Sequence, residues 1–215
     1  VSPMVEDPET CFVDAPEAAE SCLGPQLEEY YCTGFSRGPV DNPQSVGAAQ
    51  PGWVLQDLQP QSCGFEQFYG LDAFRGAPTM VVLLWAGCGF CQGQTEKLQQ
   101  MHYELQAANV DVDFVIVDLA APNPPIDELT DRCNFPIFQD EATVNAWGLM
   151  GGMKDDFYFY DSTGVLKNFV PHTGDIVLST DAGYENIKNT ILDLVEHDGQ
   201  PPIRDNTQSD EENSP

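Results

Sequence analysis

Two cysteines separated by two residues are the part of the sequence best suited to chemistry. Cys88 and Cys91 enclose Gly89 and Phe90. A thiolate attacks disulfides and hydroperoxides, and a second thiol one helical turn away can resolve the adduct. At a helix N-terminus the first sulfur meets unpaired backbone N–H groups and the positive end of the helix dipole, which favour the thiolate. The spacing therefore predicts a redox pair, with Cys88 as nucleophile and Cys91 as resolving thiol.

Two other uses of such a pair are weaker. A zinc site needs four ligands, and the sequence has no second pair of this spacing. The histidines lack ligand spacing: His102, His172 and His197. A purely structural disulfide is sterically awkward across so short a loop. We therefore expect no metal and no cofactor, with a metal trap formed by Cys88, Cys91 and Cys133 as the weaker alternative.

The segments around the pair alternate between strand-like and helix-like patterns. The apolar run 79–85 predicts a strand covered on both faces, and helical spacing over 91–108 predicts the helix that the pair opens. Further strands are expected at 53–55, 112–119, 136–139, 157–160 and 165–169, and further helices at 126–133, 141–147 and 184–195. The order predicts a three-layer α/β/α fold with a mixed central sheet. In such sheets, chemistry collects at the carboxyl ends of the central strands, where Cys88 lies.

Pro136 is the second element of the predicted site. A proline that opens a short strand cannot donate to the ladder and needs a special geometry. If the bond before Pro136 is cis, the backbone of Phe135 is presented to a substrate facing Cys88. We therefore expect a substrate-presenting cis-proline loop at Phe135 and Pro136. Nearby, Cys133 is an auxiliary redox thiol, the partner of an N-terminal cysteine, or a buried inert thiol, and His172 either reaches the rim of the site or is solvated.

The ends of the chain differ from its middle. Residues 1–50 are acidic, rich in Pro and Gly, and show no sustained apolar period, so this extension needs a staple to become ordered. Four cysteines outside the redox pair are candidates for structural disulfides, with three pairings open: Cys11, Cys22, Cys32 and Cys63. Residues 51–198 form the predicted redox domain, and 199–215 a disordered acidic tail.

The charge and the cysteine content narrow the partners and the compartment. With 35 acidic and 8 basic side chains the net charge is −27, which argues against nucleic acid and anionic lipid as partners. No apolar run approaches the ~20 residues of a membrane-spanning helix. Seven cysteines favour an oxidising compartment, and the start at Val1 suggests that a leader was removed or cut away. We expect a secreted, periplasmic or cell-surface protein.

The sequence from residue 51 to the last helix resembles the thioredoxin fold and, more closely, the N-terminal domain of selenoprotein P; the composition favours a bacterial member. The resemblance is carried by the redox pair and three further motifs: Pro136-Ile137-Phe138-Gln139, Trp147-Gly148-Leu149, and Gly152-Met153-Lys154-Asp155-Asp156-Phe157. It implies selenocysteine at the position of Cys88, so the natural residue is either cysteine or a replaced selenocysteine. It also implies peroxidase activity, but the family's selenium-delivery tail has no match here.

One departure from thioredoxin bears on mechanism. Many thioredoxins bury an Asp two residues before the Trp of the motif strand, where it relays the proton of the resolving thiol. Leu83 occupies that position here, so another Asp or Glu must substitute if the relay is kept. The acidic surroundings would in general raise the pKa of a thiol and oppose the helix dipole.

The sequence thus predicts a thiol-disulfide oxidoreductase or a thiol- or selenol-dependent peroxidase. Its partners would be a disulfide or hydroperoxide substrate and an external thiol reductant. The alternative is a non-catalytic binding or selenium-related storage module on the same fold.

Overall fold

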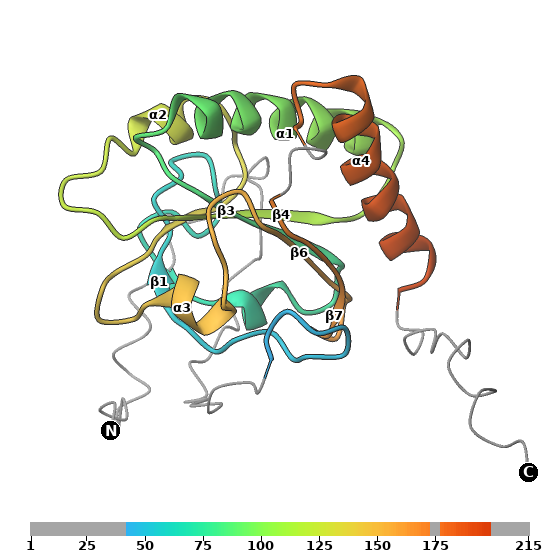
Figure 1. Cartoon of the computed structure of the whole chain (residues 1–215), viewed down its shortest axis with the longest axis horizontal. Helices are drawn as coiled ribbons and strands as arrows, with labels where there is room; N and C mark the ends of the chain where they lie inside the picture. The colour runs from blue at the N-terminus through green and yellow to red at the C-terminus, as the bar shows by residue number, and fades with distance from the viewer. Residues whose placement is uncertain (1–41, 173–176, 199–215) are drawn as a thin grey trace, which may run out of the picture.

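A five-stranded sheet of order β5-β4-β3-β6-β7 forms the centre of the computed structural model, which describes residues 42–172 and 177–198 (Figure 1). Three strands are parallel: β3 (Thr79–Leu84), β4 (Asp113–Asp118) and β5 (Ile137–Gln139). β6 (Phe157–Tyr160) runs antiparallel to β3, and β7 (Leu166–Val170) antiparallel to β6. The mixed sheet predicted from the sequence is confirmed.

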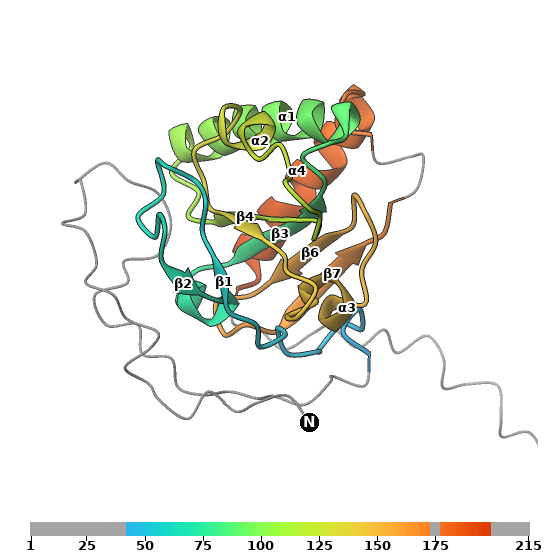
Figure 2. The same cartoon turned by 90° about the vertical axis from the view of Figure 1, so that its left-hand side faces the viewer.

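Two different layers cover the faces of this sheet (Figure 2). On one face lie α1 (Gly89–Ala107), α2 (Asp127–Thr130) and α4 (Asp181–Glu196). On the other lie α3 (Ala146–Met150), the hairpin of β1 (Leu55–Gln56) and β2 (Phe68–Tyr69), and the 3-10 turn η3 (Leu71–Phe74). The predicted three-layer architecture is therefore present, although the second layer is only partly helical.

The central strand β3 explains why both faces are covered. All its residues are buried, and alternate side chains enter opposite cores because successive side chains of a strand point to opposite faces. Met80 and Val82 pack under α1, whereas Val81 and Leu83 pack toward α3 and the hairpin. A strand buried on both sides reads as a continuous apolar run, which is the pattern that predicted it.

The helix expected at 141–147 begins later, at Ala146. Its amino end is capped from a distance, because the Asp140 carboxylate accepts the backbone N–H groups of Glu141, Ala146 and Trp147. Asn145 adopts a left-handed conformation with φ 55° and caps Gly148. The intervening residues therefore form a turn instead of a first helical turn.

The last residues of the predicted N-terminal extension pack on the domain. The Gly47 N–H donates to the Leu166 carbonyl and the Gln50 N–H to the Gly164 carbonyl, both at 2.8 Å. The rest of the extension and the tail after residue 198 lie outside the described residues, so the proposed division stays a prediction. Among residues 42–172 and 177–198, no helix combines the length and apolarity needed to cross a membrane.

Candidate active site

Cys88 lies at the N-cap of α1, just beyond the carboxyl end of β3. A tight turn makes this connection: the Cys88 N–H donates to the Trp85 carbonyl at 2.9 Å. Asp118, at the carboxyl end of the adjacent β4, accepts the Ala86 N–H at 2.7 Å. The carboxyl ends of two neighbouring strands therefore fix the turn that carries the Cys88 thiol. This is the end of the sheet at which the sequence placed the redox pair.

The half-buried Cys88 thiol is set up to ionise. Burial alone would raise its pKa. The backbone N–H and the thiol of Cys91, the backbone N–H of Phe90 and the charge of Lys154 outweigh burial and hold the pKa of Cys88 below its ordinary value. Local donors at a helix start thus prevail over the acidic character of the chain.

The Cys91 thiol has the opposite environment. It is fully buried, and burial, the Cys88 side chain and the negative charge of Asp155 raise its pKa far above the ordinary value, although a backbone hydrogen bond opposes this. Cys91 is therefore a protonated thiol at neutral pH. The two thiols therefore differ in acidity, because the pKa of Cys88 is lowered and that of Cys91 is raised.

The buried carboxylate of Asp155 lies against Cys91. It is 1% exposed, and Oδ1 lies 3.4 Å from the Cys91 Sγ and 2.7 Å from the Gln94 Nε2. The other oxygen, Oδ2, forms an ion pair with Lys154 and lies 3.8 Å from the His172 Nδ1. The structure thus supplies the buried acid that Leu83 does not, from a different part of the chain.

The backbone holds Asp155 in place beside β3. The Asp155 N–H donates to the Leu83 carbonyl at 2.7 Å, and the Leu83 N–H donates to the Asp156 carbonyl at 3.1 Å. Asp155 has a φ of 71°, a left-handed conformation that Asp tolerates better than most residues. The Asp156 carboxylate accepts the N–H groups of Met153 and His172. The loop before β6 is therefore tied on both sides of the carboxylate.

Three side chains form the rim around these groups. The Lys154 Nζ lies 5.4 Å from the centre of the Phe90 ring, and the His172 ring meets Phe90 edge-on at 6.2 Å. Burial would lower the pKa of Lys154, but Asp155 and the two cysteines raise it above the ordinary value. Lys154 therefore stays charged beside the redox pair, and His172 lies at the rim instead of standing apart in solvent.

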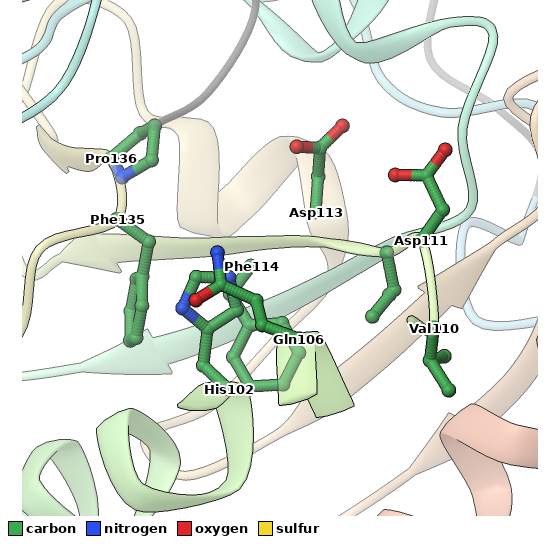
Figure 3. Close-up of a pocket in the computed structure, with 9 residues that line it drawn as sticks. His102, Gln106, Val110, Asp111, Asp113, Phe114, Phe135 and Pro136 are labelled. Atoms are coloured by element: carbon green, nitrogen blue, oxygen red, sulfur yellow. The ribbon is translucent and has the colours of Figure 1, made fainter. Parts of the chain in front are cut away.

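The prediction of a cis-proline loop at Phe135 and Pro136 is wrong. The bond between them is trans, and both line a cavity at the other end of the sheet (Figure 3). Phe135 packs on His102, which lies three turns beyond Cys91 along α1, roughly 16 Å. The physical reason is direction: β5 is parallel to β4, so Pro136 precedes the amino end of β5, beside the middle of β4, whereas Cys88 follows the carboxyl end of β3.

The other predicted cysteines fall into two groups. Cys133 is a buried free thiol whose contacts are the Gln59 amide and two backbone carbonyls, and burial raises its pKa to about 12. Cys63 is disulfide-bonded. Three members of the predicted staple lie outside the described residues: Cys11, Cys22 and Cys32. Within the described ranges, no cluster of His, Cys, Asp and Glu side chains is arranged to hold a metal.

Sequence reasoning quoted Lys154 and Asp155 as a family motif but gave them no role. A usable signal was present, because the motif directly precedes the strand at 157–160. That strand is antiparallel to β3, so its amino end lies beside the carboxyl end that bears Cys88. Placing the motif there requires knowing the strand direction.

Comparison with solved structures shows the fold. A putative thiol:disulfide interchange protein DsbE from Chlorobium tepidum superposes with a TM-score of 0.56 at 18% identity, covering 70% of this chain and 98% of that one. A putative protein disulfide isomerase from Bacteroides thetaiotaomicron gives 0.53 at 12% identity, covering 71% and 91%. The fold is thioredoxin-like.

Comparison of sequences shows the family. Selenoprotein P from Homo sapiens is 27% identical over 138 residues, which are 61% of this chain and 34% of the human protein. The Bos taurus protein is 26% identical over 142 residues, or 63% and 33%. The matched region thus spans about a third of these relatives' length. The family model described as the N-terminal region of selenoprotein P matches residues 44–173, more than half of the chain. This chain belongs to that family.

Proposed function

We propose that this chain is a thiol-disulfide oxidoreductase that uses Cys88 and Cys91. The observation that carries the proposal is the contrast between the two thiols. Cys88 is half-buried with a lowered pKa, and Cys91 is fully buried with a raised pKa and a carboxylate 3.4 Å away. A nucleophile that ionises and a resolving thiol that keeps its proton are the two roles that disulfide exchange needs.

The first step is attack by the Cys88 thiolate on a substrate disulfide. A bond forms between the Cys88 Sγ and one substrate sulfur, and the substrate S–S bond breaks. The second substrate sulfur leaves as a thiolate and takes a proton from solvent. The positive charge of Lys154 favours the thiolate that starts this step.

The second step resolves the mixed disulfide. Asp155 Oδ1 takes the proton of the Cys91 thiol, and the Cys91 sulfur attacks the Cys88 Sγ. A bond forms between Cys88 and Cys91, the bond between Cys88 and the substrate sulfur breaks, and the bound substrate leaves as a second thiolate that takes a proton from solvent. The substrate has gained two electrons and two protons, and an external thiol reductant restores the pair by the reverse exchange.

Hydroperoxide reduction is a second activity that the half-buried Cys88 thiol, with its lowered pKa, supports. The thiolate attacks the outer oxygen and the O–O bond breaks, which leaves a sulfenic acid on Cys88 and an alkoxide that takes a proton from solvent to become the alcohol. The Cys91 sulfur then displaces water and forms the same disulfide. A selenocysteine at position 88 would enter both reactions in the same role.

We also propose an extracytoplasmic location. Structural disulfides persist in oxidising compartments, and Cys63 is disulfide-bonded. Fractionation of the source cells with an antibody against the chain tests this placement.

Differential alkylation with peptide mass mapping tests the function. The reduced chain is mixed with one equivalent of an aromatic disulfide or a hydroperoxide, and the released thiol or consumed peroxide is followed in parallel. We expect Cys88 and Cys91 to convert to a mutual disulfide, Cys88→Ser to abolish turnover, and Cys133→Ala to keep it.

Full turnover in Cys88→Ser overturns the proposal. So does a pair that stays reduced with both reagents, and that result favours the binding or storage module. Loss of turnover in Cys133→Ala would instead return Cys133 to the site as an auxiliary thiol.

A further inference from the structure

The proton that Asp155 takes from Cys91 has no direct way out. The Asp155 carboxylate is 1% exposed, so it cannot exchange protons freely with bulk water. Oδ1 is occupied by the Cys91 Sγ and the Gln94 amide. Any onward transfer must therefore use the side of Oδ2, which faces Lys154 and His172.

Lys154 is unsuited to accept this proton. Its side chain is 38% exposed and its pKa is raised by Asp155 and the two cysteines, so the amine is already protonated at neutral pH. An ammonium group has three donors and no lone pair. Lys154 can hold the carboxylate charge in place, but a proton acceptor must be another group.

His172 has the required lone pair and the required access. Its side chain is 41% exposed, and its Nδ1 lies 3.8 Å from the Asp155 Oδ2. Its backbone is tied to the Asp156 carboxylate at 2.8 Å and its ring meets Phe90 edge-on. A movement of about 1 Å would bring Nδ1 within hydrogen-bond distance of Oδ2. An imidazole is also the side chain whose charge ordinarily changes between pH 5 and 8.

We propose that His172 is a positioning residue of the redox pair that carries protons between the Asp155 carboxyl and solvent. This rests on the proposed function. After Cys91 gives its proton to Oδ1, a half-turn of the carboxyl group presents that proton to the neutral His172 ring. The O–H bond breaks, an N–H bond forms at Nδ1, and the carboxylate is restored. The imidazolium then releases a proton to water.

The groups that surround the His172 ring come from two elements, the loop before β6 and α1. Among the described residues, Asp155 and Lys154 face the ring from the loop before β6, and Asp156 accepts its backbone N–H. On the side of α1, the His172 ring contacts the uncharged Phe90 ring. Cys91 lies farther away, on the opposite side of the Asp155 carboxylate. The His172 ring therefore lies closer to Asp155 than to Cys91, which it reaches only through that carboxylate.

A chromogenic aromatic disulfide separates the two chemical steps in stopped flow. The first thiolate is released when Cys88 attacks and the second when Cys91 resolves. For His172→Gln we expect an unchanged first phase and a second phase at least about tenfold slower. This slowing is smaller than the roughly 10²–10⁴-fold loss of rate that is typical when the group that takes the proton itself is removed. Added imidazole should restore the second phase by carrying the proton.

His197→Gln is the matched control, because His197 is similarly exposed (43%) and contacts a carboxylate, Asp193, on α4. It should leave both phases unchanged. The proposal is overturned if the His172→Gln second phase superimposes on the wild type across the pH range, if both phases slow equally, or if imidazole restores nothing. A wild-type chain that shows neither phase overturns the proposed function itself.

Discussion

Two short segments each enter a strand of the same sheet, but only one of them lies beside the redox pair. Phe135 and Pro136 precede β5, which is parallel to β4, and they border a cavity of about 130 Å³ with His102 and Asp113. Residues 154–156 precede β6, which is antiparallel to β3, and they meet the redox pair. Both segments look alike in the sequence, since each follows a helix-like stretch and opens an apolar strand.

The difference teaches that strand direction decides which segment meets the chemistry. A strand antiparallel to β3 starts beside the end of β3, whereas β5, parallel to β4, starts opposite Ile116 in the middle of β4 and runs toward the carboxyl end. The proline was the more conspicuous residue, but its strand does not bring it to the redox pair. The charged pair Lys154 and Asp155 lies beside Cys91 instead.

Asp155→Asn should give the largest effect. Asn tolerates the same left-handed backbone and fills the same volume, but it cannot take the Cys91 proton. We expect the second phase of the aromatic-disulfide reaction to slow by roughly 10²–10⁴, so that the mixed disulfide on Cys88 accumulates. Intact mass spectrometry of the trapped adduct checks this. A second phase within a factor of two of the wild type would contradict the role given to Asp155.

Phe135→Ala should give a comparable loss of a different kind. Phe135 is 1% exposed and packs on His102 and Phe114, so its truncation should lower the free energy of unfolding by about 3 kcal/mol. Chemical denaturation measures the loss, while both kinetic phases of the folded variant should match the wild type. A slowed redox phase would return this loop to the site.

The two segments also show what the sequence can and cannot predict. Continuous apolar runs and helical spacing locate β3, β4 and α1, because burial on both faces leaves a direct trace in composition. The redox pair follows from its spacing and its place after β3. The partner of Cys91 does not, because Asp155 lies far along the chain and reaches the thiol only through the β3–β6 pairing. Tertiary pairing, not local pattern, selects it among many acids.

Lys154→Met should shift the reactivity of Cys88. Methionine keeps the stem of the side chain on Phe90 but removes the charge that lowers the pKa of Cys88. We expect the midpoint of the Cys88 alkylation rate against pH to rise by up to about one unit, since Lys154 is partly exposed and its field is screened. Mass mapping of the Cys88 peptide after iodoacetamide pulses measures it. Lys154→Arg is the control and should keep the wild-type midpoint; a midpoint unchanged in the methionine variant would remove Lys154 from the site.

Asp113→Asn should give the smallest effect and probes the opposite edge. Burial, with Asp111 nearby, raises the pKa of Asp113 to about 7 from an ordinary value near 3.8. The folded chain therefore binds this proton more tightly than the unfolded chain, so its contribution to stability is lost as pH rises from about 4 to about 7. The asparagine variant lacks this loss and should gain on the order of 1 kcal/mol relative to the wild type above pH 7, after allowance for screening.

Chemical denaturation at several pH values measures the difference in free energy of unfolding between Asp113→Asn and the wild type. This difference separates the effect of Asp113 from that of two other buried groups that titrate in the same pH range. His102 has a pKa lowered to about 4 by burial, and Asp118 a pKa raised to about 6. Both are common to the two proteins and cancel in the comparison. Because Asp113 lies at the amino end of β4 and Asp118 at the carboxyl end, the stability curves should diverge while the two redox phases coincide. Redox phases that change with Asp113→Asn would show that the two edges of the sheet are coupled.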